Sequence, residues 1–242
     1  MGIGGRASYN GITFTDTDRR VRTGEHGSVD LPRTPRWLRA VRKKLSRIPL
    51  LRGLTLFLQP GMALVLAVLI ISDALTLAGM QWDWNATDTV ILAAGAVTLI
   101  VLLLVRRKKG GGFGAMRRYH AAEHMAINVY EAGLPVTAEN VAAAKRTHPR
   151  CGTNLTVIML PLGIPVVLLC PYALALLPVV CLAYEVFIAL PRKKWLKLLL
   201  AACLWVQQHI TTASPGNKEI EAAVRGMRLM VGETRTNVTK TA

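Results

Sequence analysis

The sequence predicts a mainly α-helical, polytopic membrane protein with about four transmembrane helices, a small N-terminal β-rich segment and a cytoplasmic helical insert. Of its 242 residues, 52% are hydrophobic, and the mean hydropathy is +0.35. The apolar residues gather in blocks long enough to cross a bilayer. All 30 Lys and Arg residues fall in three segments, 1–52, 106–154 and 192–242. The positive-inside rule produces this pattern, so both termini and the insert are expected in the cytoplasm.

The N-terminal segment, residues 1–34, predicts one or two β-hairpins, because short alternating stretches are broken by Gly, Asn-Gly and Asp. Residues 35–109 form a basic helix followed by a first transmembrane hairpin. In the basic helix, 35–52, apolar residues recur at helical spacing opposite a Lys/Arg face; they are Trp37, Leu38, Val41, Leu45 and Ile48. We expect this helix to lie on anionic lipid headgroups, although a solvated helix that precedes a span would show the same pattern.

The first hairpin consists of two apolar stretches, Leu54–Gly79 and Thr89–Val105, and four basic residues follow it. The loop between the stretches contains Trp and Asp but no Lys or Arg, which suits the outer interface of the membrane. Asp73 lies within the first stretch. Because a carboxylate is costly inside a bilayer, Asp73 indicates either a functional site or a side chain that reaches the interface.

Residues 110–154 form the polar insert, and its opening segment GGGFG (110–114) predicts a flexible joint. Residues 155–191 predict a second transmembrane hairpin, because this long apolar stretch contains one charge, Glu185. The prolines at 161, 165, 171 and 178 would also allow broken or re-entrant helices. In the last segment, 192–242, the short apolar run Leu196–Ile210 predicts a surface-lying helix rather than a fifth span, and residues 218–230 predict a helix in the polar tail.

The insert carries the most informative motif, RRYHAAEHMAINVYEAG. On a helix with 100° per residue, His124 and Glu131 fall about 40° and 20° from His120, and Glu123 lies about 60° away on the other side. Two imidazoles and a carboxylate therefore share one stripe, with a second carboxylate beside it. Exposed helix faces normally carry Lys and Arg, and this stripe has almost none. The pattern favours a metal site over a solvated polar face.

Histidines at positions i and i+4 of a helix can reach one metal ion, which assigns His120 and His124 as ligands. The segment HAAEH also fits H-x-x-E-H, in which the histidines bind zinc and the glutamate, here Glu123, accepts a proton from the attacking water. Three further ligand candidates stay open: Glu131 on the same stripe, and His148 and Cys151 in the turn-rich segment HPRCG. The expected cofactor is Zn²⁺ or another divalent transition metal.

The remaining features of the composition indicate no second site. The other three cysteines lie in apolar runs and are expected to be buried thiols. His26 and His209 are expected to be ordinary interfacial histidines. The net charge of +16 raises the question of nucleic-acid binding. No basic helix alternates with aromatic residues, and the membrane accounts for the charge, so the expected partner is the lipid bilayer and not a nucleic acid.

Four segments, YHAAEHMAINVYEAGLPVTAENV, HPRCGTN, YEV and LWVQQHITTASPGNKEIEAAV, resemble the YqhQ-like proteins (domain of unknown function 1385). This bacterial membrane family is described as predicted metal-dependent enzymes. GGRASYNGI resembles a degenerate form of the family's opening G-G-x-A-x-x-x-G-V-M-M-R. The resemblance implies a bacterial inner-membrane protein that carries the HAAEH and HPRCG elements together. NGITF and ASPGN depart from the family pattern, which would alter substrate preference or activity if these segments line the site.

The sequence therefore predicts a membrane-embedded zinc hydrolase that acts at the cytoplasmic face on a lipid or peptide substrate, with Glu123 as general base. Basic residues around the motif would suit an anionic group, although the positive-inside rule also explains them; they are Arg117, Arg118, Lys145, Arg146 and Arg150. A closed set of three histidines and Cys151 would instead indicate a structural metal site in a scaffold or regulator. A metal transporter is disfavoured, because these histidines lie outside the spans.

Overall fold

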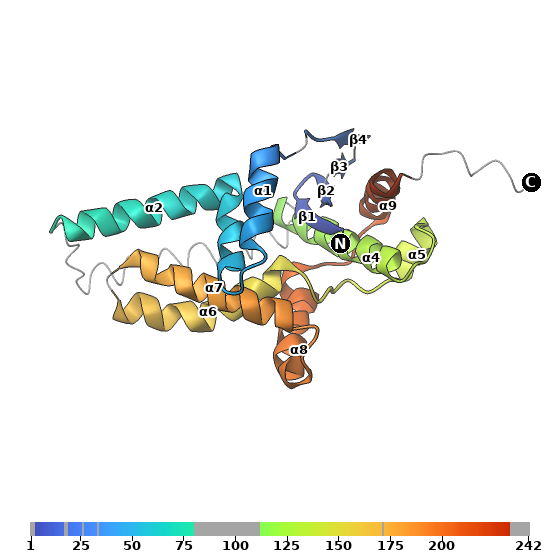
Figure 1. The fold of residues 1–242 in the computed structure, drawn as a ribbon. Coiled ribbons are helices and arrows are strands. Elements are labelled where there is room, and N and C mark those ends of the chain that lie inside the picture. The colour runs from blue at the N-terminus through green and yellow to red at the C-terminus, as the bar shows by residue number, and fades with distance from the viewer. Residues whose placement is uncertain are drawn as a thin grey trace, which may run out of the picture. The chain divides into compact units, whose positions relative to one another are not determined.

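The computed structural model describes residues 3–16, 19–25, 27–32, 34–79, 112–170 and 172–232 (Figure 1). The chain separates into two compact units whose segments alternate along the sequence. The first unit comprises Met1–Arg33, Ile91–His148 and Trp205–Ala242. The second unit comprises Thr34–Val90 and Pro149–Leu204.

The first unit begins with a four-stranded antiparallel sheet of order β1-β2-β3-β4, which confirms the predicted hairpins. Its strands are β1 (Gly4–Ser8), β2 (Gly11–Thr15), β3 (Arg20–Gly24) and β4 (Gly27–Asp30). Side chains alternate between two faces. Ile12, Phe14 and Val21 are buried on one face, while Arg22 is exposed on the other. The sheet therefore has one apolar face that needs a cover.

Two helices cover that face: α4 (Gly112–Glu131) contacts β1 and β2, and α9 (Asn217–Val231) contacts β2, β3 and β4. The two helices also pack on each other, as Figure 1 shows. α9 approaches the sheet closely at Gly226, where a Cβ atom would lie 2.5 Å from Cγ2 of Thr23 and 2.9 Å from Phe14. α9 confirms the helix predicted in the tail. A short helix, α5 (Ala138–Ala143), follows α4 and packs against both helices.

The predicted flexible joint at GGGFG differs from the structure in its last three residues. Gly112–Gly114 form the first turn of α4, and Gly114 is buried. Gly110 and Gly111 lie outside the described residues. Glycine has a low intrinsic helix propensity, but tertiary packing of α4 against the sheet overrides that preference.

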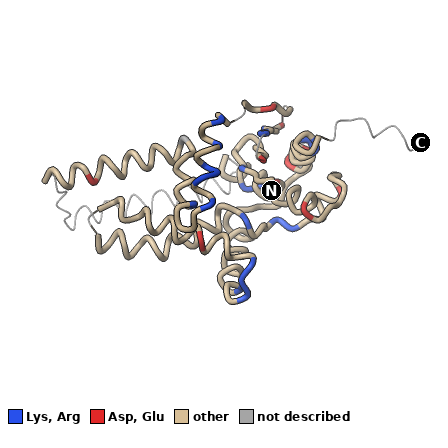
Figure 2. The backbone as a smooth tube through the Cα atoms, viewed as in Figure 1, with Lys and Arg blue, Asp and Glu red and all other residues tan. Residues whose placement is uncertain are grey.

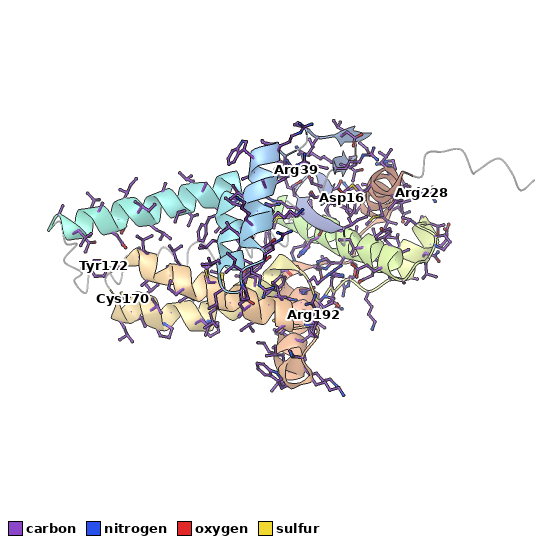
Figure 3. All side chains as sticks on the ribbon, viewed as in Figure 1. Asp16, Arg39, Cys170, Tyr172, Arg192 and Arg228 are labelled. Carbon is purple, nitrogen blue, oxygen red and sulfur yellow. The ribbon has the colours of Figure 1, made fainter. Side chains whose placement is uncertain are left out.

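The second unit consists of helices. They are α1 (Arg36–Leu45), the 3-10 helix η1 (Leu51–Leu58), α2 (Pro60–Leu77), α6 (Gly152–Leu169), η2 (Ala173–Ala175), α7 (Leu176–Ala189), η3 (Lys194–Leu196) and most of α8 (Lys197–Val206). α6 and α7 pack together as the predicted hairpin, with Cys170 and Tyr172 at its tip (Figure 3). α6 continues through Pro161 and Pro165 without a break. The basic helix predicted over 35–52 ends earlier, at Leu45.

The described residues contain one helix that is long and apolar enough to cross a membrane, Gly152–Leu169. The number of candidate spans among the described residues rises to three if each of two bent helix pairs counts as one span. These pairs are Leu51–Leu58 with Gly61–Leu77, and Ala173–Ala189 with Lys194–Thr211. The predicted span Thr89–Val105 lies outside the described residues. Figure 2 shows Lys and Arg along α1 and few charges on α2 and α6, as the sequence predicts.

Two acidic residues in the apolar helices have structural partners. The Asp73 carboxylate accepts hydrogen bonds from the backbone N–H groups of Ala173, at 2.6 Å, and Leu174, at 3.1 Å. Glu185 accepts a hydrogen bond of 2.6 Å from Nε of Arg52 and one from the backbone of Leu50. Asp73 thus caps the turn that leads into α7, which accounts for a carboxylate in an apolar helix without a functional site.

Candidate metal centre

α4 is enclosed on its histidine side as well as on its sheet side. His124 is 2% exposed and Glu123 is 4% exposed. Two segments of the first unit cover the histidines, one around Arg146 and the other around Thr211, and each bonds to a histidine ring. A solvated polar helix face would leave these rings in water. His124 therefore does not lie on a solvated polar face.

His120 and His124 lie one turn apart, with ring centroids 4.3 Å from each other and metal-binding atoms within 4.8 Å. Nδ1 of His120 lies 3.0 Å from the carbonyl oxygen of Thr211, and Nδ1 of His124 lies 2.7 Å from that of Arg146. A carbonyl oxygen only accepts hydrogen bonds, so each Nδ1 carries the proton and each Nε2 carries the lone pair. Metal-binding histidines are typically held in this way, with the second ring nitrogen donating to a carbonyl or carboxylate.

His148 lies beside this pair, with its ring centroid 6.0 Å from that of His124. Its Nε2 is 3.3 Å from a carboxylate oxygen of Glu131. Burial lowers the pKa of His148, which favours the neutral imidazole at neutral pH. A neutral ring that donates Nε2–H to Glu131 satisfies both observations, and its lone pair is then on Nδ1. The structure thus places His148 and Glu131 together as a carboxylate–histidine pair.

Side chains of α4 and Gln207 hold the segment that leads to His148 by bonding to its successive backbone groups. Asn128 on α4 donates from Nδ2 to the carbonyl oxygens of Lys145, at 2.8 Å, and Thr147, at 3.1 Å. Gln207 accepts from the backbone N–H of His148 at 2.8 Å and donates to its carbonyl oxygen at 3.0 Å. Because His124 bonds to the carbonyl between those of Lys145 and Thr147, four consecutive carbonyl groups have side-chain donors. His148 is therefore presented by a rigid segment.

Gln207 begins η4 (Gln207–Thr211), a π-helix, and is fully buried. The sequence indicated only the polar end of a surface helix here. π-helical turns inside helices are frequent at functional sites. In η4, the carbonyl oxygen of the last residue, Thr211, bonds to the His120 ring, and the side chain of the first residue, Gln207, bonds to the backbone of His148. The only signal in the sequence was a pair of adjacent glutamines that ends an apolar run.

The basic residues proposed to surround the site divide into two kinds. Arg117 donates from Nη2 to the backbone oxygens of Thr212, at 2.7 Å, and His209, at 3.1 Å. Arg118 forms an ion pair of 2.9 Å with Glu219, which is buried on α9. Lys145, in contrast, is exposed. Arg117 and Arg118 therefore stabilise the fold around the histidines, and Lys145 is available to a ligand at the surface.

Three further residues were named from the sequence, namely Cys151, His209 and His26. Cys151 belongs to the second unit, three residues beyond His148 along the chain. There its sulfur caps α6 by accepting a hydrogen bond of 3.4 Å from the backbone of Thr153. His209 is exposed and its ring stacks on Trp205 with centroids 4.8 Å apart, as suits an interfacial histidine. His26 lies outside the described residues.

Replacing Gln207 by Ala should destabilise the first unit more than replacing its neighbour Gln208. The first change leaves the buried N–H and carbonyl groups of His148 without their side-chain partner, and each such group costs about 1–3 kcal/mol. Gln208→Ala is the matched control. Thermal unfolding of the purified protein in detergent measures both. Equal melting temperatures for the two variants would contradict the stabilising role of the hydrogen bonds between Gln207 and the His148 backbone.

The fold and site thus define a mainly helical protein whose described residues include at least one apolar helix of membrane-spanning length and a compact unit with a histidine cluster. The family described as Protein of unknown function (DUF1385) matches residues 50–233, and the chain belongs to this family. It is 37% identical over 120 residues to "Uncharacterized protein YqhQ" of Bacillus subtilis (strain 168). That match covers 44% of the chain and 37% of the relative, so the chain spans little more than a third of the relative's length. No solved structure matches the chain.

Proposed function

We propose that this protein is a membrane-embedded metal-dependent hydrolase in which His120 and His124 bind Zn²⁺ through Nε2. The observation that carries the proposal is the pair of Nδ1–H bonds to the backbone oxygens of Thr211 and Arg146. They hold both rings with the lone pairs on the nitrogens that a metal would use. When bound, Zn²⁺ acts as a Lewis acid and lowers the pKa of a coordinated water to about 7.

We propose His148, whose ring lies beside that of His124, as a third ligand through Nδ1. Its Nε2–H then donates to Glu131, so that this carboxylate orients the ring instead of binding the metal. The neutral form that burial favours is also the form that binds metals. Glu131 and Cys151 as direct ligands remain the competing predictions.

Glu123 is proposed as the general base that accepts a proton from the attacking water. It is buried on α4, next to His124 in the chain, as the H-x-x-E-H pattern requires. A carboxylate held in a site with little water is a stronger base toward a reacting group than a hydrated one. Lys145 at the rim suits an anionic group on a lipid or peptide substrate.

Metal binding by the purified protein tests this proposal. Protein extracted in mild detergent, without chelators, should hold a stoichiometric transition metal, measured as metal per chain. If the protein takes up neither Zn²⁺ nor Co²⁺ after dialysis against either ion, the proposal is wrong.

A non-catalytic scaffold with a structural metal is the second candidate, because Cys151 is only three residues from His148. Three histidines and a thiolate would form a closed tetrahedral site with no position for water. Substitution with Co²⁺ separates the two functions. A thiolate-to-cobalt absorption band that disappears in Cys151→Ser would support the scaffold, and a spectrum without that band would support the hydrolase.

We also propose that the protein spans the bacterial inner membrane several times with both termini in the cytoplasm, and that α1 lies on anionic headgroups. Trp37 is 67% exposed and Val41 is 39% exposed on α1, whose last turn carries Arg42, Lys43 and Lys44. An apolar stripe beside basic residues is complementary to an anionic bilayer surface. In intact cells, an external thiol reagent should label a cysteine placed at position 85 and not one placed at position 109; labelling at position 109 would overturn this topology.

A further inference from the structure

The inward-facing side of β1 lies against the proposed general base. Gly5 pairs with Phe14 in the sheet, so it faces the same side as this buried ring. A Cβ atom on Gly5 would lie 2.5 Å from both Cγ and Cδ of Glu123 and would also overlap a carboxylate oxygen. Gly5 is not among the glycines with positive φ. Its backbone would accept any residue, and only the space that Glu123 occupies requires glycine here.

We propose that Gly5 is a positioning residue for the Glu123 carboxylate, and that strand β1 is therefore part of the candidate site. This inference rests on the proposed role of Glu123 as general base. Gly5 is exposed and Glu123 is 4% exposed, so β1 separates the carboxylate from bulk water. Because Glu123 extends from α4 to the backbone of β1, that strand limits the positions that the side chain can take. Restricting a catalytic group in this way preorganises its geometry.

This assignment extends the site to residues that precede the matched part of the chain. The family match begins at residue 50, and all four strands precede it. The sheet nevertheless shares one apolar core with α4 and α9, which includes Ile12, Phe14 and Met125. The glycine-rich start of the chain and the H-x-x-E-H helix are therefore two parts of one site, although more than a hundred residues separate them.

Two neighbouring glycines of β1 provide the test. Gly5→Ala should lower the melting temperature by about 2–10 °C, because the added methyl group must displace Glu123. Gly4→Ala is the matched control, since its Cβ would lie at an ordinary 3.9 Å from the carbonyl oxygen of Thr15. That variant should melt within about 1 °C of the parent protein. Equal effects of the two changes would overturn the inference.

A double-mutant cycle shows whether the effect passes through Glu123. Glu123→Ala removes the atoms that a Gly5 methyl group would meet, so Gly5→Ala should cost almost nothing in that background. If Gly5→Ala alone fails to fold, the double variant should still fold. Strictly additive melting shifts, or a double variant that also fails to fold, would overturn the inference.

A spectroscopic readout distinguishes positioning from simple packing. With Co²⁺ bound, Gly5→Ala should keep the metal but show the altered visible spectrum of Glu123→Gln, and Gly4→Ala should show the parental spectrum. A parental spectrum for Gly5→Ala would reduce Gly5 to a packing role and overturn the inference. If neither the parent protein nor any variant binds metal, the proposed hydrolase function is wrong. The double-mutant cycle of melting temperatures still tests the contact between Gly5 and Glu123 in that case.

Discussion

Replacing His120 or His124 by Ala is expected to lower the affinity of the protein for Zn²⁺ by more than about 100-fold. Each change removes a proposed ligand, and removal of even a supporting partner of a ligand typically costs about 10- to 100-fold. His124→Ala should also destabilise the protein by about 1–3 kcal/mol, because the partly buried carbonyl oxygen of Arg146 loses its donor. Metal per chain and competition with a chromophoric chelator measure these effects.

His209→Ala is the control for both variants. Its ring stacks on Trp205 at the surface, and its backbone oxygen, which Arg117 uses, is unaffected by the change. This variant should keep the parental metal content. If His120→Ala and His124→Ala bound Zn²⁺ as tightly as His209→Ala, the assignment of the ligands would be wrong.

Glu123→Gln is expected to keep the fold and the metal and to lower hydrolytic activity by about 10²- to 10⁴-fold, the usual contribution of general acid–base catalysis. The amide has nearly the same size and shape as the carboxylate, so the packing against Gly5 survives while the basicity is lost. Complementation of a deletion strain at matched membrane abundance is the measurement, since it reports activity whatever the substrate is.

The scaffold predicts a different outcome for the same variant. In that case Glu123 only packs beside the ligands, and Gln should substitute for it. Full complementation by Glu123→Gln, together with failure of His124→Ala at equal abundance, would count against the hydrolase and in favour of a structural metal site. Failure of both variants with metal retained only in Glu123→Gln would support catalysis.

Much of the secondary structure could be predicted from the sequence because the signals are local. Alternation and turn residues indicated the strands of the sheet, and the histidine motif and the stretch 218–230 were expected to be helical, as α4 and α9 are. Helical spacing likewise placed His120, His124 and Glu131 on one stripe. The boundaries were less accurate: Gly112–Gly114 joined α4, and the basic helix stopped at Leu45. Both differences come from packing or turn geometry that periodicity does not report.

The partners of the site residues could not be predicted in the same way. Periodicity identified the stripe on α4 but not what covers it, and the structure supplies the carbonyl oxygens of Arg146 and Thr211. Charge clustering suggested that Arg117 and Arg118 bind an anion, but both bond within the fold. The carboxylate of Asp73 was ambiguous until the backbone of Ala173 appeared as its partner.

By itself, the sequence determined the mainly helical class of the chain, most of its long helices and strands, and the residue types of a candidate metal site, because those depend on neighbours within a few turns. Only the tertiary structure decided that the strands before residue 31, the helix that bears the histidines and the π-helix at Gln207–Thr211 belong to one unit. Gly5 and Gln207 became visible as site residues only then. Their roles depend on which surfaces meet across more than fifty residues of chain, and steric fit and backbone hydrogen bonds between such surfaces leave no period in the sequence.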